Sequence, residues 1–366
     1  MFYQTSLLFH CREVQSLAPR FQAQATLSFR NFSVELRGRG RYFHLAPQFT
    51  YRDRGRLSYF PRMRGDTVGF VGWLPYFNKR WPTGSEKLAF KELCAATGLR
   101  TPAFSTRSAE ALDSVLIKHR FSSFGNGMRG PFRKSDQGEA QSRLGESEYY
   151  EEFVPGRIAK AWYWDERPVC LEVFDMPTLT GDGARSFSEL VAAQVQFPGE
   201  PPERPVLEAL ARYQGVSADD PLPAGARLIA DFRYGSPLFQ LRHSHNANVL
   251  PQHVKSEIGR QLAEAGPVFW QSIPENARLG TLYTVDAIVD AEDRVWFLEM
   301  NCNPMVHPDA YFAMFEGLLG PAAAAVGAAG AAAPPLSSLL PGLSSMPLSP
   351  VPQLAPALAG RRARQG

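Results

Sequence analysis

The spacing of apolar and polar residues predicts a protein that mixes helices with short strands. Between residues 1 and 80, aromatic and polar residues alternate, as in Ala25–Leu36, so we expect several short strands separated by Gly or Pro turns. Further strands are predicted at Val115–His119, Tyr149–Val154, Ala159–Trp164 and Pro168–Val173. Helices are predicted at Glu86–Thr97, Pro205–Tyr213 and Val254–Ala265. For the first of these helices, Ser85 is a plausible N-cap and Gly98 a plausible C-terminal residue.

The composition changes near Gly320, where the chain becomes rich in Ala, Pro, Ser and Leu up to its last residues, RRARQG. Such a composition is typical of a disordered tail. We therefore expect three parts: a β-rich, Arg- and aromatic-rich N-terminal domain at 1–82, an α+β domain at 83–319 and a disordered tail at 320–366.

The segment Thr281–Pro304 carries the most informative polar residues. Two apolar runs flank the turn Asp290–Arg294, which predicts a β-hairpin. Glu299 and Asn301 lie two apart on its second strand and so share a face, to which Asp286 on the first strand could also point. These oxygen donors suit a hard divalent cation such as Mg²⁺, and the alternative is a solvated acidic strand end. Apolar residues precede Glu299 directly, and a carboxylate in apolar surroundings needs a partner or a metal.

Charge and cysteine content narrow the functional classes. The 366 residues carry a net charge of only +3, which argues against a general polyanion binder. Arginines concentrate between residues 12 and 80, where a solvated sheet face or a surface for an acidic substrate is favoured over nucleic-acid binding.

The cysteines Cys11, Cys94, Cys170 and Cys302 form no CxxC pair, so neither zinc nor a disulfide framework is expected, and a cytoplasmic location fits. No signal-peptide pattern and no membrane-spanning apolar run are read.

Upstream of the hairpin, four motifs follow in an order that fits a nucleoside triphosphate site. Lys87 begins a helix and Lys118 ends a strand, and both ammonium groups could neutralise phosphates. Ser122–Gly130 is a glycine-bearing loop whose N–H groups could cover those phosphates. Glu151–Val154 is an extended segment, followed by Pro155, whose main chain could hydrogen-bond a purine edge.

In this order, the motifs resemble those of the ATP-grasp superfamily of carboxylate–amine ligases, over roughly residues 84–317. The resemblance implies an α+β ATP-grasp fold, in which two α+β subdomains clasp ATP, here preceded by the small β-rich domain. It implies three metal ligands, Asp286, Glu299 and Asn301. The ATP-binding residues that it implies are Lys87, Lys118, Ser123, Gly125, Gly127, Glu151, Glu152, Phe153 and Val154.

Two further segments resemble cyanophycin-synthetase-like and glutathione-synthetase-like members of that superfamily. The first is Pro177–Leu190, which contains a Gly-Asp-Gly motif that could equally be a tight turn. The second is Arg242–Pro251, where a substrate role for His243 and His245 is set against an exposed polar loop.

The chain departs from the superfamily pattern at two positions. Ile158 stands where relatives have an acidic residue for the ribose, so Glu151 or Glu152 would have to hold the ribose. Thr284 stands where relatives similar to D-alanine ligase have an arginine for the developing oxyanion. Lys160 or Arg242 would then supply that charge and act as catalytic residues together with Lys118.

The resemblance implies an activity that uses ATP and Mg²⁺. A carboxylate would be activated as an acyl phosphate and joined to an amine as an amide, on an amino acid or peptide in specialised metabolism. The expected partners are these small substrates, with a homo-oligomer possible and no membrane. The alternative is a catalytically degenerate ATP-binding regulator or scaffold, which the departures at Ile158 and Thr284 favour.

Overall fold

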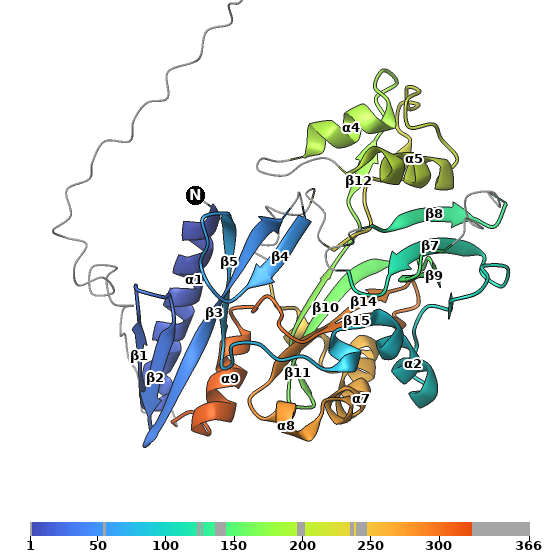
Figure 1. Cartoon of the computed structure of the whole chain (residues 1–366). Coiled ribbons are helices and arrows are strands. Elements are labelled where there is room, and N and C mark those ends of the chain that lie inside the picture. Colours follow the sequence, from blue (N-terminus) through green and yellow to red (C-terminus); the bar gives the residue numbers. More distant parts are fainter. Residues whose placement is uncertain are drawn as a thin grey trace, which may run out of the picture. The chain divides into compact units, whose positions relative to one another are not determined.

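The computed structural model of the protein describes residues 2–53, 56–122, 125, 127–135, 144–195, 202–234, 238 and 247–323. Residues up to 324 form one compact unit. Helices and antiparallel sheets alternate in it, which confirms the predicted α+β class (Figure 1). From residue 324 on, the tail predicted at 320–366 lies outside the described residues. In the described part of the chain, no helix combines the length and apolar character needed to cross a bilayer.

The N-terminal region begins with a helix, α1 (Phe2–Leu17), where strands were expected. Its buried residues His10, Val14 and Leu17 recur every three or four positions, which is the period of a helix with one buried face. Five antiparallel strands follow and form one sheet: β1 (Ala23–Leu27), β2 (Val34–Gly38), β3 (Arg41–Asp53), β4 (Arg56–Phe60) and β5 (Thr67–Leu74). The long strand β3 connects the sheet, because it pairs with β2, β4 and β5.

Two four-stranded antiparallel sheets follow along the chain. The first has the order β6 (Phe104–Ser105), β9 (Glu148–Glu152), β7 (Ser114–His119) and β8 (Arg129–Arg133). The second has the order β11 (Arg167–Phe174), β10 (Arg157–Trp164), β14 (Leu282–Val289) and β15 (Val295–Asn301). The hairpin predicted at Thr281–Pro304 is therefore confirmed as β14 and β15.

Helices cover these sheets. Helix α2 (Lys87–Thr97) packs against β15, and α7 (Glu257–Ser272) packs against β11 and β15. The N-cap of α2 is Glu86 and not Ser85, whereas Gly98 ends the helix in the left-handed conformation, as predicted. The remaining elements are α4 (Phe187–Gln194), α5 (Arg204–Tyr213), α6 (Leu250–His253), α8 (Glu275–Arg278), α9 (Ala310–Leu319), the short strands β12 (Thr178–Thr180) and β13 (Arg227–Ile229), and the 3₁₀ turns Ala18–Phe21 and Pro82–Gly84.

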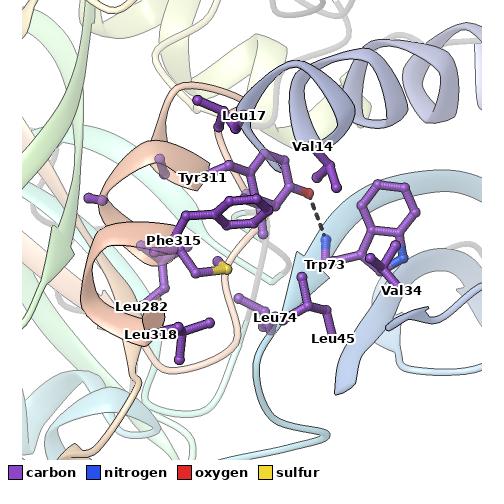
Figure 2. Packing of buried hydrophobic residues seen from close by; sticks show 14 of the residues in the cluster. Val14, Leu17, Val34, Leu45, Trp73, Leu74, Leu282, Tyr311, Phe315 and Leu318 are labelled. Atoms are coloured by element: carbon purple, nitrogen blue, oxygen red, sulfur yellow. Dashed lines mark hydrogen bonds between the residues drawn. The ribbon is translucent and has the colours of Figure 1, made fainter. Parts of the chain in front are cut away.

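One hydrophobic core joins the N-terminal sheet to the later elements. Figure 2 shows Val14 and Leu17 of α1 and Trp73 of β5 in the same cluster as Leu282 of β14 and Phe315 of α9. Figure 1 shows α9 on the same side, beside the N-terminal strands. Because one core runs across residue 82, the division into domains at that point stays a prediction.

A single hydroxyl group links three of these elements. The oxygen of Tyr311 accepts a hydrogen bond from the backbone N–H of Trp73 at 2.8 Å (Figure 2), and it lies 2.9 Å from Nδ1 of His10. Burial, together with the charge of His307, lowers the pKa of His10 to about 3, so its ring is neutral here.

We expect Tyr311→Phe to lower the free energy of unfolding by about 1–3 kcal/mol, because it leaves the buried N–H of Trp73 without an acceptor. Chemical denaturation measures the change. Tyr42→Phe is the matched control, since the Tyr42 side chain is 53% exposed. Equal stability of the Tyr311→Phe and Tyr42→Phe variants would show that the hydrogen bond contributes nothing.

Candidate active site

Four charged side chains form a row across the sheet β11-β10-β14-β15. Lys160 of β10 lies directly opposite Glu172 of β11 and Asp286 of β14, and Asp286 lies opposite Glu299 of β15. Directly paired residues project from the same face of a sheet, so the four meet on one side. Their side chains are 6% exposed at Glu172, 8% at Lys160, 14% at Asp286 and 21% at Glu299. The charges are thus largely removed from water.

The neighbouring row places Asn301 beside the carboxylates. Asn301 pairs with Thr284, two residues from Asp286, and its Nδ2 donates to Oδ2 of Asp286 at 3.1 Å. The three predicted metal ligands, Asp286, Glu299 and Asn301, therefore come together. This set contains two carboxylates and one amide. Among the described residues, no group of three or more His, Cys, Asp or Glu side chains is suited to a metal. Two carboxylates and one amide oxygen fit Mg²⁺, which takes its remaining oxygen ligands from water or phosphate.

Two lysines neutralise these carboxylates. Nζ of Lys87 lies 2.7 Å from Oε2 of Glu299 and also donates to the carbonyl of Ser122, while Lys160 pairs with Asp286. Burial raises the pKa of Asp286 to about 6, against the opposing charge of Lys160. Burial acts in the same direction on Glu299, but the ammonium of Lys87 outweighs it and holds the pKa of Glu299 at about 2. Each of the two acids, Asp286 and Glu299, therefore has a cationic group next to it.

A second buried cluster fixes Lys118. Its ammonium binds Oε1 of Glu151, whose Oε2 lies 2.7 Å from Nζ of Lys91 and accepts from the hydroxyl of Tyr149 at 3.2 Å. Burial works against ionisation of Glu151, but Lys118 and Lys91 together lower its pKa. Burial also lowers the pKa of Lys91. Lys91 was not among the predicted residues, although it lies four residues after Lys87 and therefore on the same face of α2.

The predicted adenine-binding segment lies at the end of β9. The N–H groups of Glu152 and Phe153 already donate to the carbonyls of Ala103 and Ser114. Val154 follows the end of the strand. A role of these main-chain groups in holding adenine stays a prediction.

Ile158, which stands where an acidic residue was expected, is buried in an apolar cluster. It lies opposite Phe174 on one side and Ile288 on the other. The structure thus gives this position an apolar packing role. A ribose contact through Glu151 or Glu152 stays a prediction.

Several predicted residues lie outside the described residues. Ser123 in the glycine loop is one, and Arg242, His243 and His245 are others. Gly125 and Gly127 are described, with φ of +70° and +71° respectively. A Cβ at Gly127 would come within 3.0 Å of the His119 ring, so this conformation requires glycine.

The Gly181–Gly183 motif forms a turn. The carboxylate of Asp182 accepts hydrogen bonds from the N–H groups of Ala184 and Arg185, and Gly181 passes close to the carbonyl of Pro223. These contacts agree with the tight-turn interpretation, which the sequence left open. A substrate role for this segment stays a prediction.

Three aromatic residues near the charged row were not predicted from the sequence. The hydroxyl of Tyr234 donates to Oε2 of Glu172 at 2.9 Å, and Nε2 of His307 lies 3.9 Å from Oε1 of Glu172. Tyr59 of β4 is close enough to Asp286 that burial and the carboxylate charges raise its pKa. No local motif marks these residues, because they approach the row from three separate segments.

No protein-family model matches the chain, and no curated protein sequence matches it significantly. Solved structures that it resembles are ligases and synthetases. A bifunctional glutathione synthetase from Pasteurella multocida matches with a TM-score of 0.34 and 13% identity, over 77% of this chain and 38% of that chain. A D-alanine–D-alanine ligase from Bacillus anthracis matches with a TM-score of 0.34 and 11% identity, over 65% of this chain and 66% of that chain.

An N5-carboxyaminoimidazole ribonucleotide synthetase from Thermotoga maritima matches with a TM-score of 0.32 and 12% identity, over 65% of this chain and 50% of that chain. The chain thus spans between 38% and 66% of the length of these three proteins.

We expect Lys91→Met to lower the free energy of unfolding by about 3 kcal/mol, because it removes one of the two ammonium groups that compensate the buried Glu151. Urea denaturation measures the loss. Lys134→Met is the control, since Lys134 is 56% exposed and lies 3.9 Å from Asp113 at the surface, where such pairs contribute little. A Lys91→Met variant as stable as the control would refute a compensating role for Lys91.

Proposed function

We propose that this chain is an ATP-dependent carboxylate–amine ligase of the ATP-grasp type. The observation that carries the proposal is the convergence of Asp286, Glu299 and Asn301 on one sheet face, with Lys87 paired to Glu299. Two carboxylates and an amide for a cation, next to lysines for phosphates, are the components that phosphoryl transfer from ATP requires.

The lysines would bind the nucleotide phosphates. Lys87 and Lys118 each have their ammonium group fixed by a carboxylate, Glu299 and Glu151 respectively. Such fixed cations stabilise the negative charge of phosphates with little reorganisation. Asp286, Glu299 and Asn301 would hold Mg²⁺, which when bound neutralises charge on the transferring phosphoryl group.

The proposed reaction has two steps. A substrate carboxylate attacks the γ-phosphate of ATP, which forms an acyl phosphate and releases ADP. The amine then attacks the acyl carbon, inorganic phosphate leaves, and the amine loses a proton as the amide forms. Lys160 lies next to Asp286 on the same face and would stabilise the developing oxyanion in place of an arginine at position 284.

The glycine loop would exclude water from the acyl phosphate. Gly125 and Gly127 both adopt positive φ values, which favour glycine, and the loop follows directly after the strand that carries Lys118. A loop that closes over the phosphates would protect the acyl phosphate from hydrolysis. The substrates we favour are an amino acid or a peptide in specialised metabolism, joined by a peptide-like bond.

The proposal is tested by measuring ADP release from MgATP with a panel of carboxylic acids and amines, and by mass spectrometry of the products. A ligase consumes ATP only when both substrates are supplied, and its product has the mass of acid plus amine minus water. ATP binding without ADP release across the panel would instead support the degenerate regulator or scaffold.

We expect Glu299→Gln to lower the rate of ADP release on the order of 100-fold, because a neutral amide holds Mg²⁺ less well during phosphoryl transfer. Glu292→Gln is the control, since Glu292 lies on the exposed turn of the same hairpin and pairs with Arg294. If Glu299→Gln releases ADP at the parent rate, the metal assignment is wrong.

A further inference from the structure

Glu172 is a buried carboxylate that the proposed nucleotide chemistry does not use. It ends the charged row on β11, and Lys160 stands between it and Asp286. Neighbouring strands lie about 4.8 Å apart, so Glu172 is about 10 Å from Asp286 across two strands. A buried carboxylate requires a compensating group, and this holds for Glu172 during turnover as well.

The surroundings of Glu172 suit an ammonium group. The ammonium of Lys160 lies 4.5 Å from the ring centroid of Tyr234 and 6.0 Å from that of Trp162. The ring of His307 packs edge-on against Trp162 at 5.4 Å. A carboxylate beside aromatic faces is the arrangement in which proteins bind amines, and here the chain already holds an ammonium group of its own.

An independent observation points to a ligand at this place. Among the described residues, two buried side-chain polar atoms have no hydrogen-bond partner, Oγ1 of Thr284 and Nε2 of Gln48. Thr284 is fully buried and lies opposite Trp162 on the same face as Asp286. Buried polar atoms without partners are rare, and a bound ligand is one way in which they are satisfied.

We propose that Glu172, Tyr234 and Trp162 bind the primary ammonium group of the amine substrate, while Thr284 binds an oxygen of that substrate. The inference rests on the proposed ligase function and names the site of its second substrate. The hydroxyl of Thr284, which has no other hydrogen-bond partner, donates to that oxygen. The site thereby selects a small primary amine that carries an oxygen acceptor.

The first test compares amines with their acetylated forms. Thermal unfolding of the full-length protein with MgADP is measured with each of the common L-amino acids and with its N-acetyl derivative. We expect at least one free amino acid to raise the Tm and its N-acetyl derivative to have no effect. Equal stabilisation by the two forms, or no stabilisation by any free amino acid, overturns the proposal.

The second test removes the charge at Glu172. We expect Glu172→Gln to weaken binding of the stabilising amino acid at least about tenfold, because the amide cannot compensate a desolvated ammonium group. Glu166→Gln is the control, since Glu166 is exposed on the turn that joins the same two strands, β10 and β11. Unchanged amine affinity in Glu172→Gln overturns the proposal.

The third test uses the unpartnered hydroxyl group. We expect Thr284→Val, which keeps the shape of the side chain, to leave the Tm of the ligand-free protein equal or higher while it raises the KM for the amine and not that for ATP. A residue with a purely structural role would leave the KM for the amine unchanged, and that result overturns the role of Thr284.

The failure of this site and the failure of the proposed function are distinguishable. Binding of MgATP is measured separately by calorimetry for the parent protein and for Glu172→Gln. We expect the two affinities to agree, because Glu172 lies outside the set of metal and phosphate ligands. A parent protein that does not bind MgATP refutes the ligase function. If the parent protein binds MgATP but the Glu172→Gln variant binds the amine as tightly as the parent does, the amine site alone is refuted.

Discussion

The structure depends on one row of largely buried charges, in which Lys160 lies between Glu172 and Asp286 and Glu299 ends the row beside Asp286. Ionised groups in a protein interior are costly unless an opposite charge or a hydrogen bond compensates each of them. Lys160 and Lys87 supply that compensation for Asp286 and Glu299. The register of four strands must be kept for this to work, because a slip of one residue would turn each of these side chains to the opposite face.

The N-terminal sheet helps to hold this register. The hydroxyl of Tyr76 donates to the carbonyl of Leu282 at 2.6 Å, at the start of β14, and lies 3.1 Å from the carbonyl of Cys302, just after β15. The N–H of Val306 donates to the carbonyl of Val71 on β5 at 2.8 Å. Both ends of the acidic hairpin are therefore tied to the N-terminal region. A change in that region would therefore reach the metal donors through these backbone contacts.

The parts of the site that local spacing determines could be predicted from the sequence. Glu299 and Asn301 share a face because they lie two apart on a strand, and a turn between two apolar runs brings Asp286 opposite Glu299. Glu172, Tyr234 and Tyr59 could not be predicted, because their positions depend on which strands pair and in which register. Such pairings join residues far apart in the chain, and no local pattern encodes them. Helix α1 was missed although its buried residues His10, Val14 and Leu17 recur at helical spacing.

The pairing of Asp286 and Glu299 with lysines also bears on what the site can bind. A buried ion pair adds little to stability, whereas an uncompensated buried charge is strongly destabilising. Lys87 and Lys160 therefore allow Glu299 and Asp286 to ionise in the absence of a cation. The two ion pairs add little to the stability of the cation-free protein. Asp286 and Glu299 would hold a divalent cation beside these two ammonium groups, which would face phosphate and a developing oxyanion. Glu172, on the other side of Lys160, is the carboxylate of the row that would receive the ammonium group of an incoming amine.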